Sequence, residues 1–172
     1  MKILECVPNF SEGRDRKKID AITDALQRVS GVRLLDICTD ADHNRTVFTF
    51  IGSPDDIGRG AAAACDRALA LIDMREQQGV HPRIGAVDVV PFIPLGNAVM
   101  ADAVEAARRF GRAFAQRNGL PVYFYGEAAL VEERRELPRI RRGGYEGLEK
   151  RMKEPQCVPD AGPAFITARS GA

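Results

Sequence analysis

The pattern of apolar and polar positions predicts a chain that alternates between strands and helices. Apolar residues recur at helical spacing in three long segments, and short runs rich in β-branched and aromatic residues predict strands between them. The predicted helices are residues 15–29, 53–72 and 100–116, and the predicted strands are residues 2–8, 32–39, 46–51, 84–93 and 122–125. We interpret this order as an α/β protein of the α+β type, with a single mixed β-sheet of about six strands and helices on one face.

Helices on one face would leave the other face of the sheet uncovered. Six strands at ~4.8 Å spacing and ~17 Å length have a projected face of roughly 500 Å². That area is at the upper end of the apolar patches that a soluble monomer normally exposes. We therefore expect another domain, another copy of the chain, or a ligand between the two to cover this face.

A loop flanked by glycine and proline precedes the strand at residues 84–93 and contains His81, one of two histidines in the chain. The strand is apolar on both faces apart from Asp88, and Pro91 and Pro94 keep its end out of a central ladder. Imidazole titrates near neutral pH, so a histidine fixed at the mouth of a strand suits a proton shuttle. The alternative is a loop or capping histidine with no catalytic role.

The C-terminal third of the chain has a different character. Residues 127–150 are strongly charged and mostly helical, and their segments EERRE and RIRR are typical of a solvated face. Residues 154–172 are rich in proline and glycine, as in a linker. We therefore predict a domain at residues 1–153, followed at residues 154–172 by a linker.

Composition and charge narrow the function classes. Apolar residues make up 45% of the chain, charged residues make up 28%, and the net charge is +1, so we expect neither nucleic acid nor a membrane as a partner. The chain has no strand–GxGxxG–helix unit, no P-loop and no CxxC pair, which disfavours nucleotide and zinc sites. We expect reduced thiols, a cytoplasmic location and no metal, and we interpret Cys6, Cys38 and Cys65 as small buried apolar side chains.

Polar residues gather at strand ends and in loops, where functional side chains are usually placed. Together they can furnish a site that handles an amine or a carboxylate, but each cluster alone can also be an ordinary turn. The clusters are Asn9, Ser11, Glu12 and Arg14; Asp40, Asp42, His43, Asn44 and Arg45; His81 and Arg83; and Tyr125, Gly126 and Glu127. We expect the cluster at residues 40–45 to form a structured loop beside His81.

Five sequence blocks resemble those of one known family. The blocks are ECVPNFSEGRD, DADHNRTVFTFIG, GVHPRIGAVDVVPFIPL, PVYFYGEAA and PDAGPA, and they occur in this order over essentially the whole chain. The chain thus resembles the N-terminal subdomain of the glutamate formimidoyltransferase (formiminotransferase) family.

The resemblance implies transfer of a formimidoyl group between N-formimidoyl-L-glutamate and tetrahydrofolate, a step of histidine degradation in one-carbon metabolism. It implies two similar subdomains with opposed sheet faces, folate bound between them, and His81 as the general acid/base. It also implies a folate-binding segment after the PD-x-GP motif: Gly162, Pro163, Ala164, Phe165, Ile166, Thr167, Ala168, Arg169, Ser170 and Gly171. The middle of this segment, residues 164–170, departs from the family pattern.

Other site residues are candidates with an open alternative. Arg45 or Arg83 can hold a glutamate carboxylate, or can anchor a loop through a salt bridge. Asn9 and Tyr125 are further substrate-binding candidates, and Tyr123 and Tyr125 lie on one side of their predicted strand, where they line a pterin pocket or only pack.

By this resemblance, residues 1–153 are the N-terminal subdomain, and residues 154–172 are a linker and the start of the C-terminal subdomain, which this chain otherwise lacks. We expect the isolated chain to be inactive or nearly so and to form a homodimer through its open sheet face, or to join a C-terminal subdomain that is encoded separately. The alternative function is a non-catalytic folate-binding or interaction module that retains the fold.

Overall fold

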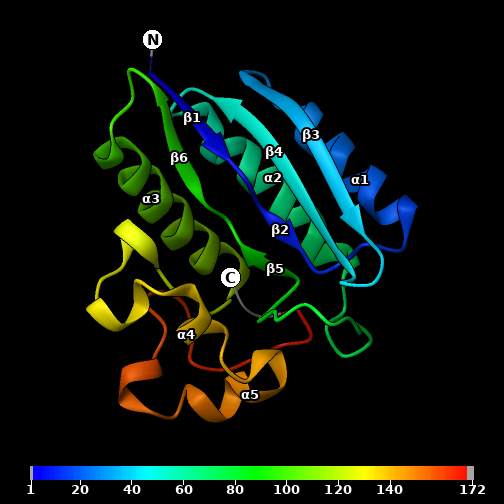
Figure 1. Ribbon diagram of the computed structural model, residues 1–172, viewed down its shortest axis with the longest axis vertical. Coiled ribbons are helices and arrows are strands. Elements are labelled where there is room, and N and C mark those ends of the chain that lie inside the picture. Colours follow the sequence, from blue (N-terminus) through cyan, green and yellow to red (C-terminus); the bar gives the residue numbers. More distant parts are fainter. Residues whose placement is uncertain (1, 170–172) are drawn as a thin grey trace.

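The structure, a computed structural model, describes residues 2–169 as an antiparallel sheet backed by helices (Figure 1). The strands are β1 (Lys2–Cys6), β2 (Asn9–Phe10), β3 (Val32–Asp40), β4 (Arg45–Gly52), β5 (Val87–Val89) and β6 (Phe92–Gly96). The six strands, the accompanying helices and the α+β class confirm the predicted fold. The pairings between these strands are all antiparallel, so the expected mixed sheet was wrong in that respect.

The six strands form four rows. β1 and β2 follow one another along one row, and β6 and β5 pair with them along the next. β4 pairs with β1 and β2 on one side and with β3 on the other, so the row order is β3, β4, β1 with β2, and β6 with β5. Helix α1 connects β2 to β3, and helix α2 connects β4 to β5. In each case one row of the sheet lies between the two connected strands, which is the split βαβ arrangement of ferredoxin-like folds. Parallel rows are therefore never adjacent, which explains the antiparallel pairings.

The long helices lie behind the sheet in Figure 1 and cover one face. They are α1 (Arg16–Gln27), α2 (Asp56–Leu71) and α3 (Met100–Asn118), close to the predicted bounds. The Asp15 side chain caps α1 by accepting from the backbone N–H of Lys17. The Ser53 hydroxyl accepts from the backbone N–H of Asp56, the first residue of α2.

Strand β4 shows how the two faces of the sheet differ. Phe48 and Phe50 are fully buried against the helices, whereas the alternating side chains of Val47 and Ile51 remain partly exposed on the other face. Cys6 and Cys65 are buried as predicted. The prediction for Cys38 was wrong: it is exposed, because its cross-strand partner is Val47 on the open face.

Two predicted strands have different bounds in the structure. The run at residues 84–93 is divided into β5 and β6 around Pro91, which has no N–H to donate to the ladder. The run at residues 122–125 forms only an isolated bridge, between Val122 and Ala161. Its side chains pack in two directions, Phe124 toward the main core and Tyr123 toward a small second cluster.

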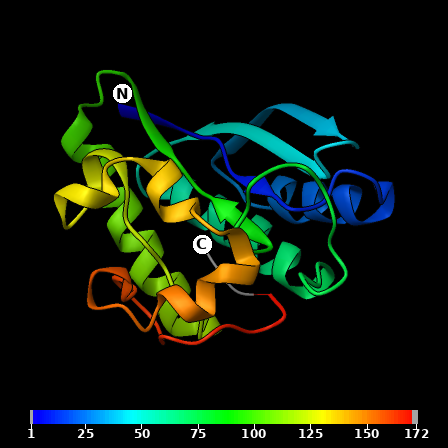
Figure 2. The same ribbon diagram turned by 60° about the horizontal axis from the view of Figure 1, so that its bottom comes forward.

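The C-terminal third folds against one end of the sheet (Figure 2). It contains α4 (Leu137–Arg141), α5 (Gly144–Arg151) and 3₁₀ turns at Gly126–Ala128, Glu132–Arg134 and Pro155–Cys157. The expectation of a purely solvated face was wrong for Arg134, which is 9% exposed. It forms an ion pair with Asp160 and donates to the carbonyls of Gln156 and Val158, so it anchors the residues that follow the charged segment.

Within residues 2–169, no helix is long and apolar enough to cross a membrane.

We predict that Arg134→Met lowers the free energy of unfolding by about 3–5 kcal/mol, because it leaves the Asp160 carboxylate buried without its cation. The matched control is Arg135→Met, which removes an exposed guanidinium paired with Glu127 and costs about 1 kcal/mol or less. Urea unfolding of both variants measures the difference. Equal and small losses for the two would show that the buried pair does not stabilise the fold.

Candidate active site

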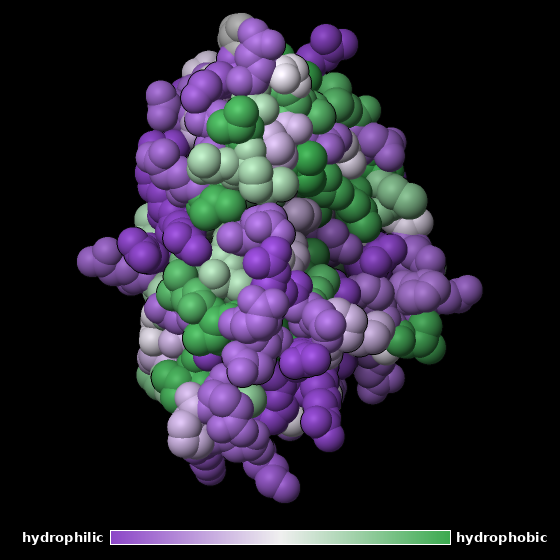
Figure 3. Space-filling view, turned by 60° about the vertical axis from the view of Figure 1, so that its left-hand side comes forward, coloured by the Kyte–Doolittle hydropathy of each residue, from purple (hydrophilic) through white to green (hydrophobic). Residues whose placement is uncertain are grey.

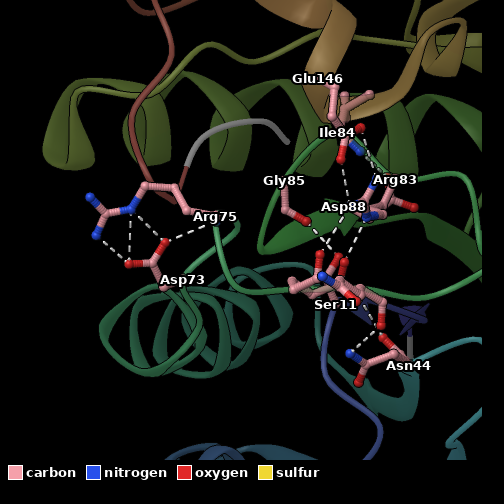
Figure 4. A network of polar contacts seen from close by, with 11 residues as sticks. Ser11, Asn44, Asp73, Arg75, Arg83, Ile84, Gly85, Asp88 and Glu146 are labelled. Carbon is pink, nitrogen blue, oxygen red and sulfur yellow. Dashed lines mark hydrogen bonds and ion pairs between the residues drawn. The ribbon is translucent and has the colours of Figure 1, made fainter.

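The loop that carries His81 is fixed on its C-terminal side by the first strands. The Ser11 hydroxyl donates to the carbonyl of Gly85 at 2.7 Å, and the Ser11 N–H donates to the carbonyl of Ala86 at 3.0 Å. The Asp88 carboxylate accepts from the backbone N–H of Ile84 at 3.0 Å, as Figure 4 shows. The backbone just after His81 therefore has a defined position.

His81 lies against Arg45 of β4, whose Nη1 donates to Nε2 of the imidazole at 3.0 Å. A guanidinium has only donors, so Nε2 must accept through its lone pair. The imidazole is then neutral in this arrangement and carries its proton on Nδ1. The structure thus joins two of the predicted site residues in one contact.

The surroundings of His81 lower its pKa from the ordinary 6.5 to about 4. Burial of the ring is the largest cause, and the positive charges of Arg141, Arg45, His43 and Arg83 add to it. At neutral pH the side chain is therefore neutral, and its affinity for a proton is lower than that of an ordinary histidine.

The loop at residues 40–45 is structured and lies beside His81, as predicted. The Asp40 carboxylate accepts from the backbone N–H groups of Asp42 and His43, and it contacts His43 Nδ1 at 2.7 Å. The hydrogen bond from the His43 N–H lowers the pKa of Asp40. The rings of His43 and His81 meet edge to face, with centroids 6.3 Å apart.

Two loops, at residues 40–45 and 77–83, are joined by amide side chains. Asn44 donates from Nδ2 to the carbonyl of Gln78, and Gln77 donates from Nε2 to the carbonyl of Asn44. At Gly79 an added Cβ would lie 2.4 Å from the carbonyl oxygen of His43, so only glycine allows this approach. These bonds and the close approach at Gly79 hold the two loops together, and they thereby set the distance between His81 and Arg45.

Arg83 makes contacts that favour the anchoring alternative. Its Nε donates to Gln77 Oε1 at 2.7 Å, and its guanidinium pairs with Glu146 of α5 at 2.8 Å. Figure 4 shows the pair of Arg83 and Glu146 above Asp88. Arg83 thus links the His81 loop to the C-terminal helices and has few donors left for a substrate.

Asn9 and Tyr125 flank the site on different sides. Asn9 pairs with Val47, two residues from Arg45 on the same face of β4, and its side chain donates to the carbonyl of Val7. Burial raises the pKa of Tyr125 well above its usual value, and the charges of Arg141 and Asp88 also act on it. Asn9 therefore belongs to the open sheet face, and Tyr125 belongs to the buried side of the site.

A pocket of about 220 Å³ lies between α3, the connection from β5 to β6, and residues 122–128. Its lining is mostly apolar, and Tyr123 and Tyr125 both contribute to it. Apolar side chains gather on the side of the molecule that carries α3 (Figure 3). Tyr123 also packs under Arg134 and donates to the carbonyl of Cys157, and burial raises its pKa to about 12. The packing alternative therefore describes Tyr123 well, whereas Tyr125 lies between the pocket and the His81 site.

The described part of the segment implied to bind folate, residues 162–169, runs along the same end of the molecule. The carbonyls of Thr167, Ala168 and Arg169 accept from Tyr145, Met74 and Ala86, respectively. An added Cβ at Gly162 would collide with Leu120, so this glycine is required by packing. Ala164, Phe165 and Arg169 have exposed side chains, Pro163 and Ile166 are partly buried, and Ser170 and Gly171 lie outside the described residues.

Sequence reasoning missed two residues of the site, Asp88 and Arg141. Asp88 is 2% exposed and forms an ion pair with Arg141 of α4, which in turn faces His81. A single carboxylate in an otherwise apolar strand was a usable signal for Asp88. Arg141 carried no such signal, because it stands in a run of charged residues.

Among residues 2–169, no three histidine, cysteine, aspartate or glutamate side chains group together as a metal site.

Comparison with known proteins connects this geometry to a family. The family described as "Formiminotransferase domain, N-terminal subdomain" matches residues 3–172. Among similar proteins, the formimidoyltransferase-cyclodeaminase of Gallus gallus is 47% identical over 171 residues, which are 99% of this chain and 32% of that protein. The one from Dictyostelium discoideum is 46% identical over the same shares, and the glutamate formimidoyltransferase of Thermoplasma acidophilum is 42% identical over 96% of this chain and 55% of its own length.

The chain belongs to the formiminotransferase N-terminal subdomain family. It spans about a third of the length of the two formimidoyltransferase-cyclodeaminases and just over half of the length of the glutamate formimidoyltransferase from Thermoplasma acidophilum.

We predict that His81 titrates near pH 4 and that Arg45→Met raises this pKa, because the variant removes a cation and the donor to Nε2. In the unfolded chain His81 binds a proton below about pH 6.5, whereas in the folded chain it does so only below about pH 4. Through this group the free energy of unfolding therefore decreases as the pH is lowered from 6.5 to 4. Proton NMR of the histidine rings, with His43→Gln used to assign the signals, measures the pKa of His81 in the unchanged chain and in Arg45→Met. The control is Arg33→Met, roughly 20 Å away along the sheet; a pKa of 6.5 or higher in the unchanged protein would contradict the arrangement.

Proposed function

We propose that this chain takes part in formimidoyl transfer between N-formimidoyl-L-glutamate and tetrahydrofolate, with His81 as the general acid/base. The observation that supports the proposal is a neutral imidazole held by Arg45 at the end of an open sheet face. Membership of the formiminotransferase family and relatives named glutamate formimidoyltransferase point to the same chemistry.

The reaction requires one proton to leave a nitrogen and one to reach another. The amine nitrogen of the folate attacks the amidine-type carbon of formimidoylglutamate, and a carbon–nitrogen bond forms while His81 accepts the proton of that amine. His81 then returns the proton to the glutamate nitrogen as the bond from carbon to that nitrogen breaks. Glutamate leaves with a neutral amine, and no oxidant or further reactant is needed. A positioned imidazole is usually worth 10²–10⁴-fold in rate.

The two substrates would occupy different parts of the site. Arg45 can bind a glutamate carboxylate, because its guanidinium has no carboxylate partner among the described residues. For the folate, the exposed Phe165 and Arg169 and the pocket beside Tyr125 are the candidate contacts. Residues 162–169 lie at the same end of the molecule as the His81 loop, because Ala86 donates to the carbonyl of Arg169.

The open sheet face supports a role for a second sheet. Ile3, Val47, Ile51 and Ile93 stay partly exposed on this face. We propose that a second subdomain, in the same polypeptide or a separate one, covers it, with residues 154–172 leading to that subdomain. In its absence, two copies of the chain would pair through this face as a homodimer. The four cysteines are free, which suits a reducing compartment such as the cytoplasm.

We predict that His81→Ala lowers turnover of formimidoylglutamate with tetrahydrofolate by at least about 100-fold in the assembly that contains this domain, because the proton relay is lost. A thermal melt serves as the control for folding. Retention of more than about a tenth of the rate would remove His81 as the acid/base. A folded protein that binds folate and shows no turnover, with or without His81, would favour the non-catalytic module.

We predict that the isolated chain self-associates through its open face. Burying roughly 500 Å² of face contributes on the order of 10 kcal/mol if the area is mostly apolar, and a twofold contact lets one face cover another. Light scattering over a concentration series measures this, with Ile51→Glu as the variant that should weaken pairing. A strict monomer at roughly tens of micromolar would show that the face is polar enough to stay in water.

A further inference from the structure

Two buried donors without partners belong to arginines whose charges act on His81. Among the described residues, the buried side-chain nitrogens and oxygens that lack a hydrogen-bond partner are Nε of Arg45 and Nε of Arg141. Both guanidinium groups act on the same imidazole, and Arg141 has the larger effect of the two charges. A buried N–H without a partner is costly, so two such groups on arginines that act on the same imidazole indicate a missing acceptor.

Arg141 is held in place by a carboxylate that is itself buried. Asp88 of β5 pairs with one terminal nitrogen of Arg141 and uses its other oxygen to accept from Ile84 of the His81 loop. The side chain of Arg141 is 18% exposed and that of Asp88 is 2% exposed. Arg141 is thereby fixed beside a loop that is more than fifty residues distant in the sequence.

The charges around His81 do not balance. Arg83 is paired with Glu146, Arg141 is paired with Asp88, and Asp40 is occupied by His43. No carboxylate among residues 2–169 lies within ion-pair distance of Arg45. The site therefore carries an excess positive charge and two unused, planar hydrogen-bond donors, which match a carboxylate.

We infer that Arg45 and Arg141 together bind one glutamyl carboxylate of the substrate, and that Asp88 is a positioning residue for Arg141. The inference rests on the proposed function, and it assigns a substrate-binding role to an arginine from the charged C-terminal segment. Arg45 and Arg141 come from β4 and α4, so the carboxylate would join the two parts of the domain across His81.

Binding of the carboxylate would change the proton affinity of His81. The groups that face the ring are His43 from the loop at residues 40–45, Arg45 from β4, Arg83 from its own loop and Arg141 from α4. Asp88 and Glu146 are engaged by Arg141 and Arg83. An incoming anion would offset the cations and draw Arg45 away from Nε2, which raises the pKa of His81 toward neutrality. The substrate would thus prepare the histidine to hold the proton that the reaction moves.

The test measures binding directly, so that it does not depend on turnover. The NMR signal of His81 is followed during titration with L-glutamate and, separately, with p-aminobenzoyl-L-glutamate, because the folate tail also has glutamyl carboxylates. In the unchanged chain, the favoured ligand should raise the pKa of His81. Arg141→Met should weaken its binding about ten- to a hundredfold, and Arg141→Lys should restore part of the affinity.

The matched control is Arg142→Met, which removes the same charge from the adjacent, exposed residue and should leave affinity unchanged. Asp88→Asn should weaken binding, and adding it to Arg141→Met should cause no further loss, because a positioning residue acts only through its partner. If Asp88→Asn does not fold, the two Arg141 variants still decide the question.

Equal affinity of Arg141→Met and the unchanged chain would overturn the inference, and so would equally tight binding of inorganic phosphate. A preference for one glutamyl probe over the other identifies which substrate supplies the carboxylate, and either preference supports the inference. If the carboxylate site is found but no assembly containing this domain transfers a formimidoyl group, the inference holds and the proposed function fails.

Discussion

The candidate site depends on the position of Asn44. This residue is 7% exposed and adopts a positive φ of 49°, which asparagine tolerates better than most residues. Its side chain accepts from Gly13 and donates to Gln78, and its carbonyl accepts from Gln77. Asn44 thus joins the segment after β2, the turn between β3 and β4, and the loop that carries His81. The backbone N–H of Val80 also donates to the carbonyl of Asp42, so the bonds of Asn44 and this backbone bond together hold the two loops that bring Arg45 and His81 into contact.

The sequence allowed correct predictions wherever the signal was local. The three long helices followed from apolar spacing, and the loop beside His81 followed from its density of residues that bond to the backbone. Pro91 was expected to keep the end of one strand out of a central ladder, and the division of that strand into β5 and β6 was not predicted. The error over Cys38 arose because β3 lies at the edge of a sheet with one bare face, where a strand pattern does not say which side is buried.

The charged C-terminal segment could not be interpreted from its sequence. Arg134, Arg141 and neighbouring exposed cations belong to the same kind of run, and no local pattern separates them. What separates them is the partner that the fold brings near: Asp160 for Arg134, and Asp88 for Arg141. Asp160 and Asp88 stand in an irregular segment and in an apolar strand, respectively, far from either arginine in the sequence. Long-range pairing of this kind is set by topology, so it becomes visible only in three dimensions.

The electrostatics of the site show why the domain tolerates an unfavourable local arrangement. Three arginines near one imidazole repel the proton that an acid catalyst must hold, and two of their N–H groups are buried without acceptors. The ion pairs of Asp88 with Arg141 and of Glu146 with Arg83 compensate by giving two of the arginines a carboxylate partner. Arg45 alone has no such compensation, and it is also the arginine that contacts His81 directly. Arg45 is therefore the arginine that an anion would neutralise, and it is also the one in contact with His81. Under our proposal, binding of the anion would balance the charge of the site and change the proton affinity of His81 at the same time.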